Sequence, residues 1–258
     1  MTLCQVRRLG RVSYAAAWAL QKSLAAQRAA GEIPDTLLLL EHPHTYTLGR
    51  SGHAENLLLD DAQLATRGLT LFHVDRGGDI TYHGPGQLVG YPILSLGAPV
   101  SVAVGRAADG LASGRVPQAD YVGYVRRLED ALIRALTRLG LVTGQVPGLT
   151  GVWVQPDVAS RCAHCPPAAR LAPSKLAAIG VKVDARGITQ HGFALNVDPD
   201  MSYWDGIIGC GLRDHAVVSL ADLLDPPPTM ETVMDAVVES FGKVFAREMA
   251  ERVEQPSQ

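Results

Sequence analysis

A glycine-rich polar segment in the first third of the chain is the feature that most constrains the fold. Residues 76–87 read RGGDITYHGPGQ and contain four glycines and one proline. Apolar runs typical of strands border the segment on both sides, at residues 69–75 and 88–94. So much glycine beside polar side chains indicates a backbone that passes close to a ligand, because glycine lets the main chain turn sharply and leaves room for a bound group. The segment therefore predicts a ligand-binding loop between two strands.

Helices are expected at the start, centre and end of the chain, with strands between them. Apolar residues recur at helical spacing in three segments, residues 13–30, 120–139 and 230–253. We expect Ser13 to cap the first helix, and Gly31 and Gly140 to end the first and second. Further strand-like runs are residues 36–40, 151–155, 175–183 and 192–197. This order predicts a mixed α/β (α+β) domain with one sheet in its core.

Composition and length limit the classes of protein that this chain can belong to. It has 258 residues, 47% of them hydrophobic, which is typical of a globular protein. We expect one domain, residues 1–258, with loop insertions at 97–119 and 156–174. The net charge of −3 gives no overall attraction to nucleic acid or to anionic membranes.

No apolar run approaches the roughly 20 residues that span a bilayer, and the first residues lack an apolar signal core followed by a cleavage site. We therefore expect a cytoplasmic protein with reduced thiols and no membrane or nucleic-acid partner.

The four cysteines differ in their surroundings. Cys210 lies between two glycines, which allow a tight turn and the approach of a bulky substrate, although a small buried side chain in a turn is the commoner role of a free cysteine. Cys162 and Cys165 flank His164 in the sequence C-A-H-C, but a structural zinc site needs four ligands and no second pair follows. We interpret that segment as a solvated loop, with a redox pair as the alternative. Cys4 has no polar cluster near it.

Lysine and histidine supply further candidates. Lys175 opens the run KLAAIGVKV, where strict strand alternation would place it on the same face as Ala177. A solvated strand end is the ordinary alternative for such a lysine. His83 and His191 each precede a glycine, and either is a site residue, a turn-capping residue or a surface residue.

Five segments together resemble the octanoyltransferase family of lipoate biosynthesis. In chain order they are RGGDITYHGPGQLVGYPIL, GVWV, KLAAIGVKV, HGFALNV and GCG, and LEHPHTYTLGRSG upstream also fits. The resemblance extends from roughly Leu37 to Leu220. It implies the fold of the biotin and lipoate protein ligase catalytic domains, in a single α/β domain.

The resemblance also implies roles for particular residues. The family's nucleophile corresponds to Cys210, and the lysine that lowers the pKa of that thiol corresponds to Lys175. The implied substrate contacts are Arg76, Gly77, Gly78, Asp79, Ile80, Thr81, Tyr82, His83, Ala178, Ile179, Gly180, His191, Gly192 and Phe193. No metal and no cofactor is implied. The family commonly has proline before the nucleophile, and this chain has Gly209 there.

The implied reaction transfers an octanoyl group in two steps. Cys210 attacks the thioester of octanoyl-acyl carrier protein, and a lysine of a lipoyl domain then attacks the acyl-enzyme. The implied acceptors are the lipoyl domains of 2-oxoacid dehydrogenases and the glycine cleavage H protein. Because such partners are acidic, we expect a local basic surface, with Arg50, Arg76 and Lys182 as candidates.

Three other functions remain open from the residues. An ATP-dependent lipoate or biotin ligase has no need of a nucleophilic cysteine. A cysteine hydrolase needs a Cys–His pair, for which His83 or His191 is available. A non-catalytic acyl-binding protein would bind the chain without forming a covalent adduct.

Overall fold

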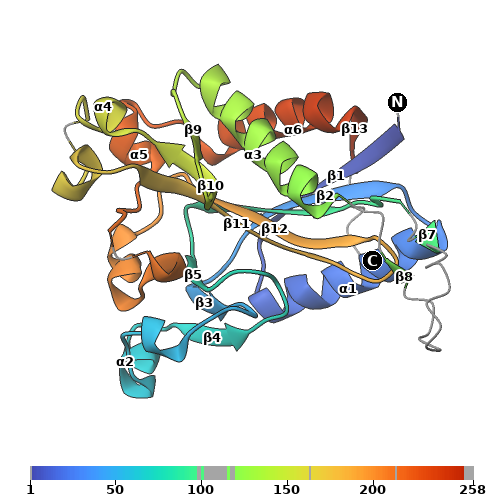
Figure 1. Ribbon diagram of the computed structural model, residues 1–258, viewed down its shortest axis with the longest axis horizontal. Helices are drawn as coiled ribbons and strands as arrows, with labels where there is room; N and C mark the ends of the chain where they lie inside the picture. The colour runs from blue at the N-terminus through green and yellow to red at the C-terminus, as the bar shows by residue number, and fades with distance from the viewer. Residues whose placement is uncertain are drawn as a thin grey trace, which may run out of the picture.

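A mixed eight-stranded sheet forms the centre of the part of the chain that the computed structural model describes, residues 2–97, 100–101, 115–116, 120–162, 164–212 and 214–252 (Figure 1). In spatial order its strands are β13 (Arg247–Glu251), β1 (Thr2–Arg11), β2 (Asp35–Glu41), β6 (Gln87–Ile93), β12 (Thr189–Asn196), β11 (Ser174–Val183), β10 (Leu149–Val154) and β9 (Gly144–Val146). Strand β1 pairs in parallel with both of its neighbours, and the other pairings are antiparallel. The mixed α/β fold expected from the sequence is confirmed.

Helices cover both faces of this sheet (Figure 1). Helices α3 (Tyr121–Arg138) and α6 (Met230–Phe245) pack against one face and α1 (Tyr14–Ala30) against the other. Leu37 and Leu39 of β2 belong to the core under α3 and α6, whereas Leu38 and Leu40 belong to the core under α1. Because successive strand residues point to opposite faces, this central strand is apolar throughout.

The helix boundaries follow the capping residues for the first two helices. The Ser13 hydroxyl accepts a hydrogen bond from the backbone N–H of Ala16 at 3.4 Å, and Gly31 ends α1 with a φ of 75°. Asp120 caps α3 by accepting from the N–H of Gly123 at 2.7 Å. Gly140, with a φ of 84°, follows the end of α3. Both predicted helices are therefore confirmed.

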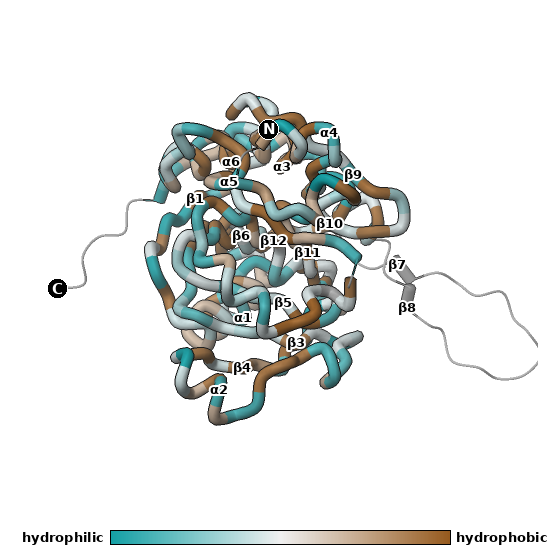
Figure 2. Tube along the Cα trace, turned by 90° about the vertical axis from the view of Figure 1, so that its left-hand side faces the viewer, coloured by the Kyte–Doolittle hydropathy of each residue, from teal (hydrophilic) through white to brown (hydrophobic). Residues whose placement is uncertain are grey.

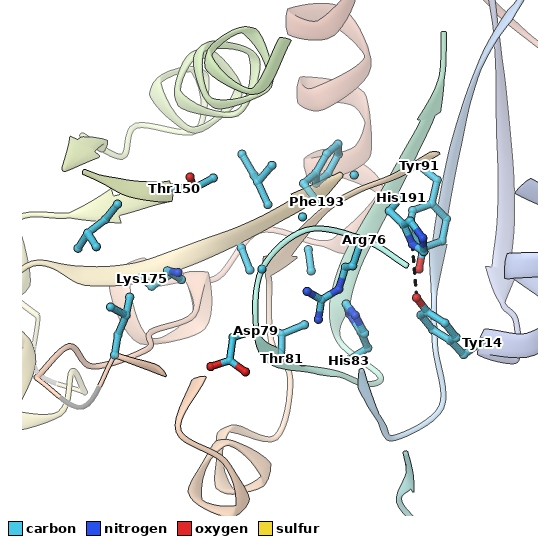
Figure 3. A pocket seen from close by; sticks show the side chains of 18 of the residues that line it. Tyr14, Arg76, Asp79, Thr81, His83, Tyr91, Thr150, Lys175, His191 and Phe193 are labelled. Atoms are coloured by element: carbon cyan, nitrogen blue, oxygen red, sulfur yellow. Dashed lines mark hydrogen bonds between the residues drawn. The ribbon is translucent and has the colours of Figure 1, made fainter. Parts of the chain in front are cut away.

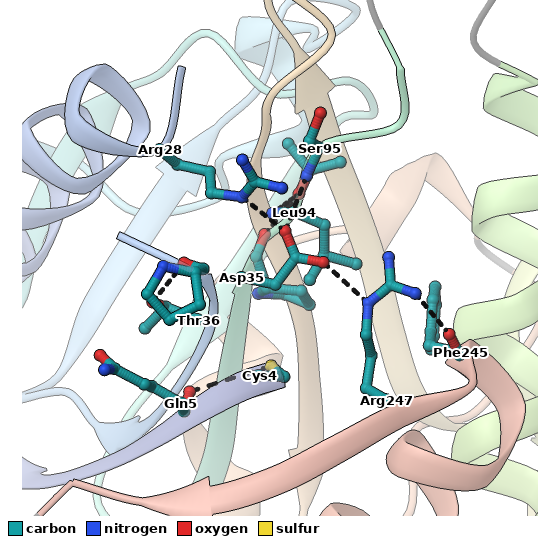
Figure 4. A network of polar contacts seen from close by, with 12 residues as sticks. Cys4, Gln5, Arg28, Asp35, Thr36, Leu94, Ser95, Phe245 and Arg247 are labelled. Atoms are coloured by element: carbon teal, nitrogen blue, oxygen red, sulfur yellow. Dashed lines mark hydrogen bonds and ion pairs between the residues drawn. The ribbon is translucent and has the colours of Figure 1, made fainter. Parts of the chain in front are cut away.

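The last helix is shorter than expected, and the prediction that it continues to residue 253 is wrong. Helix α6 ends at Phe245, Ala246 turns the chain with a φ of 51°, and residues 247–251 form the edge strand β13. The start of β13 is anchored by Arg247, whose Nε lies 2.8 Å from a carboxylate oxygen of the buried Asp35 (Figure 4). Arg28 Nε contacts the same carboxylate at 2.7 Å. Tertiary pairing thus overrides the helical periodicity of this segment.

A second, three-stranded sheet lies below the first, with α2 (Asp61–Thr66) beside it (Figures 1 and 2). It contains β4 (Thr70–His73), β3 (Thr45–Leu48) and β5 (Ile80–His83), in that order. Strand β5 lies inside the glycine-rich segment, so this segment is part strand and part loop. Short elements complete the described chain: η1 (Ala54–Asn56), β7 (Val100–Ser101), β8 (Arg115–Val116), α4 (Pro156–Ala159), η2 (Pro167–Arg170), η3 (Met201–Gly206), η4 (Gly209–Gly211) and α5 (Leu220–Leu223).

The two expected insertions have different outcomes. Apart from residues 97, 100–101 and 115–116, the segment 97–119 lies outside the described residues. The segment 156–174 contains α4 and η2, and its two cysteines are buried in the main core at 8% and 5% exposure. The interpretation of these cysteines as part of a solvated loop is therefore wrong. In the described part of the chain, we find no helix of the length and apolar character needed to cross a membrane.

Candidate active site

A cavity of about 180 Å³ opens between the central sheet and the glycine-rich segment (Figure 3). Eleven of the residues expected to contact the substrate line it, namely Arg76, Gly78, Asp79, Thr81, His83, Ala178, Ile179, Gly180, His191, Gly192 and Phe193. These residues come from three segments, 76–83, 178–180 and 191–193. The last two meet because they lie on neighbouring strands, where Gly180 pairs with Gly192 and Ile179 with Phe193. The sheet therefore assembles in one cavity segments that are far apart in sequence.

Three residues of the glycine-rich segment do not line the cavity. Ile80 and Tyr82 alternate with Thr81 and His83 along β5, and their side chains pack in the separate core of the small sheet. Gly77 instead fixes the segment to the large sheet, since its N–H donates to the carbonyl of Val181 at 3.0 Å.

Close approach of backbone segments accounts for the glycine at position 180. A Cβ atom added there would lie 3.0 Å from both Arg76 Cδ and the carbonyl oxygen of Gly77. A side chain would push the glycine-rich segment away from β11 and change the shape of the cavity.

One end of the cavity is a hydrogen-bonded polar cluster centred on His191 (Figure 3). His191 is buried, has a φ of 56°, and places Nε2 2.9 Å from a carboxylate oxygen of Asp75. The other oxygen of Asp75 accepts from Lys182 Nζ at 2.5 Å. Partial burial raises the pKa of Asp75, but hydrogen bonds from Lys182 and His191 outweigh it and bring the pKa to about 2.

Burial keeps His191 neutral. It lowers the pKa of this imidazole to about 4, even though Asp75 acts in the opposite direction. The neutral ring donates from Nε2 to Asp75 and presents Nδ1 to the Tyr14 hydroxyl, which lies 3.5 Å away.

His83 is also a weak base. Full burial holds its pKa well below the ordinary value. Its Nδ1 lies 2.9 Å from Gln87 Oε1 and its Nε2 3.3 Å from Thr47 Oγ1, so both ring nitrogens are already occupied. Neither cavity histidine is suited to accept a proton from a thiol near neutral pH.

Lys175 lies at the opposite end of the cavity from this cluster (Figure 3). It is only 6% exposed, so the interpretation as a solvated strand end is wrong. Strict alternation also fails here: Val152 pairs with Ala177 but Trp153 pairs with Lys175, which leaves Leu176 as an extra residue in β11. This bulge lets Lys175 line the cavity while Ala177 packs in the core.

The turn that contains Cys210 lies at this end of the site. Leu212 lines the same cavity as Lys175, and a Cβ added to Gly211 would lie 3.1 Å from Asp79 Oδ2. Beyond the turn, the carbonyl of Ala216 accepts from the Lys175 N–H at 2.8 Å, and the Val218 N–H donates to the Lys175 carbonyl at 3.0 Å. The backbone on one side of the turn is thus hydrogen-bonded to Lys175.

Several cavity residues were not expected from the sequence: Tyr14, Tyr91, Gly148, Leu149, Thr150, Ala194 and Leu212. Tyr91 and Ala194 lie within quoted motifs and Leu212 directly follows one, which is a usable signal. Tyr14 belongs to the apolar stripe of a helix and gives no sign of a role in a pocket.

One candidate for the basic docking surface is wrong. Arg76 is only 7% exposed, and its Nη2 donates to the carbonyl of Thr47 at 2.7 Å, so it faces the interior. Arg50 is exposed, and its N–H donates to the Arg76 carbonyl at 3.0 Å, beside the cavity. Lys182 is partly exposed and paired with Asp75.

Cys162 and Cys165 form a disulfide, so the expectation of reduced thiols is wrong for this pair. Among the residues described, none of the histidine, cysteine, aspartate and glutamate side chains form a group of three placed to hold a metal. We predict that replacing both cysteines with serine leaves the acyl transfer that the resemblance implies unchanged, because neither cysteine lines the cavity. Since the bond closes a short loop, we expect a cost of about 1–2 kcal/mol in the free energy of unfolding.

The measurement is a melting curve and a transfer assay on the double variant, with reduced wild type for comparison. Lost activity at an unchanged melting temperature, or one tightly bound zinc per chain, would contradict the prediction.

Comparison with known proteins defines the class first. The model of the lipoyl protein ligase A/B catalytic domain family matches residues 13–242. A bipartite lipoate protein ligase from Thermoplasma acidophilum has the same fold, with a TM-score of 0.67 at 16% identity over 99% of this chain and 89% of its own. A lipoate-protein ligase A bound with ATP gives 0.63 at 15% identity, over 98% and 90% of the two chains. The fold is that of a lipoyl protein ligase catalytic domain.

Sequence relatives then define the family. An octanoyltransferase of Chloroflexus aurantiacus is 44% identical over 96% of both chains. The octanoyltransferase of Acidobacterium capsulatum is also 44% identical, over 93% of this chain and 89% of the relative. This chain belongs to the octanoyltransferase family and is an acyltransferase.

Proposed function

We propose that the protein transfers an octanoyl group from octanoyl-acyl carrier protein, through a thioester on Cys210, to a lysine of lipoyl domains. The observation that supports the proposal is that Leu212, which directly follows the Gly209–Gly211 turn, lines the same cavity as Lys175 and the three segments expected to contact the substrate. The acceptors by this proposal are the 2-oxoacid dehydrogenases and the glycine cleavage H protein.

In the first step, the Cys210 thiolate attacks the thioester carbon of the donor. A C–S bond forms to Cys210, the bond to the carrier's thiol breaks, and the Lys175 ammonium gives a proton to the departing thiolate. The backbone N–H groups of the glycine-rich segment and of the turn are the candidate donors to the oxyanion.

In the second step, the acceptor lysine amine attacks the acyl-enzyme. Neutral Lys175 takes the proton that the amine loses, the amide bond forms, and Cys210 leaves as a thiolate. The starting state is restored, so one lysine serves both half-reactions.

The lining of the cavity supports a medium-length acyl group. Ile179, Phe193 and Leu149 supply apolar surface in the cavity that Lys175 lines. Both cavity histidines are weak bases, which argues against a cysteine hydrolase that would use one of them to activate the thiol. Against an ATP-dependent ligase, the ligases at 15–16% identity share the fold, whereas the relatives at 44% identity are octanoyltransferases.

The test is incubation with octanoyl-acyl carrier protein in the absence of ATP, followed by intact-mass analysis and then addition of a lipoyl domain. We expect a gain of one octanoyl group, which disappears as the lipoyl domain becomes octanoylated. Transfer that requires ATP and free acid would establish the ligase alternative. Release of free octanoate before the lipoyl domain is added would establish the hydrolase.

Carrier binding is predicted to weaken with salt. Acyl carrier proteins are acidic, and exposed charges are screened beyond roughly 8 Å at physiological ionic strength. We expect Arg50→Ala to weaken binding several-fold at low salt and to reduce the salt dependence, because Arg50 is the exposed candidate beside the cavity.

The matched control is Arg134→Ala on α3, where Arg134 pairs with Asp130 outside the cavity. Equal affinities for the two variants, or an affinity that does not change with salt, would contradict the docking prediction.

A further inference from the structure

Lys175 carries a buried positive charge that no acidic side chain neutralises in the described part of the protein. The residue is 6% exposed, and no carboxylate of those residues lies within ion-pair distance of its Nζ. The two other charged residues that line the cavity are engaged elsewhere: Arg76 bonds to Thr47, and Asp79 accepts from the N–H groups of His53 and Ile80. Burying a cation without a partner costs free energy, so another interaction must stabilise the Lys175 ammonium.

The Lys175 ammonium group lies over the face of the Trp153 ring. Lys175 Nζ lies 4.8 Å from the centroid of this ring, within the range of a cation–π interaction, and tryptophan is the strongest of the aromatic partners. The ring is completely buried and the lysine is only 6% exposed, and a cation–π attraction is stronger between groups that are removed from bulk water.

Both the strand register and a neighbouring ring hold Trp153 in place. The bulge in β11 puts Lys175 opposite Trp153 rather than one residue away. The His215 ring makes an edge contact with the indole, with centroids 5.2 Å apart and planes at 69°. His215 is itself fixed, since its Nδ1 lies 2.8 Å from the carbonyl oxygen of Pro173.

The backbone of β10 leaves space for this lysine. Gly151 has a φ of 125°, and a Cβ added there would lie 2.6 Å from the carbonyl oxygen of Ala177 and 3.5 Å from Lys175 Cε. A side chain at position 151 would therefore crowd the strand and the lysine together.

We infer that Trp153 is a positioning residue, whose ring face holds the Lys175 ammonium in the cavity. The inference rests on the proposed function, in which that ammonium acts on Cys210. A ring carries no net charge, so it stabilises the ammonium without cancelling its field. A carboxylate in the same position would hold the lysine equally well but would oppose formation of the thiolate.

The test measures the rate at which iodoacetamide alkylates Cys210, as a function of pH, in Trp153→Phe and Trp153→Leu. Phenylalanine keeps an aromatic face, and no hydrogen bond is lost because the indole N–H has no partner among the described residues. We expect Trp153→Leu to move the profile to higher pH and to slow alkylation at neutral pH about three- to tenfold, with Trp153→Phe close to wild type.

Phe241→Leu is the matched control, because it removes a buried aromatic ring from the core around α6, outside the cavity. It is expected to lower stability without moving the pH profile. If Trp153→Leu and Trp153→Phe shift together, or if neither differs from the control, the ring has only a structural role and the inference is wrong.

A double-mutant cycle with Lys175→Met tests whether the effect acts through the lysine. With Lys175 already replaced, Trp153→Leu is expected to change the alkylation rate less than twofold. An undiminished effect would overturn the inference. The octanoyl adduct on wild type is measured in parallel, so a failure of the proposed function is recognised separately from a failure of this inference.

Discussion

Replacing Cys210 with alanine is expected to abolish the octanoyl adduct and to lower the rate of transfer by at least about a thousandfold, because the chain then lacks its nucleophile. The structure argues against the other cysteines. Cys4 is completely buried, and burial, with the nearby Asp35 charge, raises the pKa of its thiol to about 12 (Figure 4). Cys162 and Cys165 are joined in a disulfide.

The measurement is intact-mass analysis after incubation with octanoyl-acyl carrier protein, combined with a transfer assay. The matched control is Cys4→Ala, which removes a thiol of the same chain and is expected to retain the adduct. An octanoyl group that persists on the Cys210→Ala variant would show that the nucleophile is a different residue.

The sequence predicted which segments meet in the cavity better than it predicted the details of the fold. The glycine-rich segment and the motifs on β11 and β12 were expected to contact one ligand, and the structure places most of them in one cavity. Such motifs can be recognised in a sequence because they combine unusual residue types at fixed spacing. Helices α1 and α3 were also predictable, since capping residues mark their ends.

Elements that depend on distant partners could not be predicted. Strand β1 had no clear signal, and β13 followed a helical pattern, yet the two pair in parallel across almost the whole length of the chain. The bulge at Leu176 depends on the pairing between β10 and β11, and no residue in KLAAIGVKV indicates it. The same limit applies to Tyr14, which reaches the cavity only because α1 packs on the sheet.

Replacing Lys175 with alanine is expected to move the pH profile of Cys210 alkylation upward and to slow acylation about ten- to a hundredfold at neutral pH. A nearby ammonium lowers the pKa of a thiol by favouring the thiolate, and without it only a few per cent of an ordinary cysteine is ionised.

Lys175→Arg separates the two roles proposed for the lysine, because the guanidinium keeps the charge but does not give up a proton near neutral pH. We therefore expect Lys175→Arg to recover more of the alkylation rate than of the transfer rate. Iodoacetamide alkylation and single-turnover transfer, each measured across pH for the three proteins, give the comparison. Coincident alkylation profiles would show that Lys175 does not set the reactivity of Cys210, and equal recovery of both rates by arginine would remove the proton-transfer role while leaving the electrostatic one.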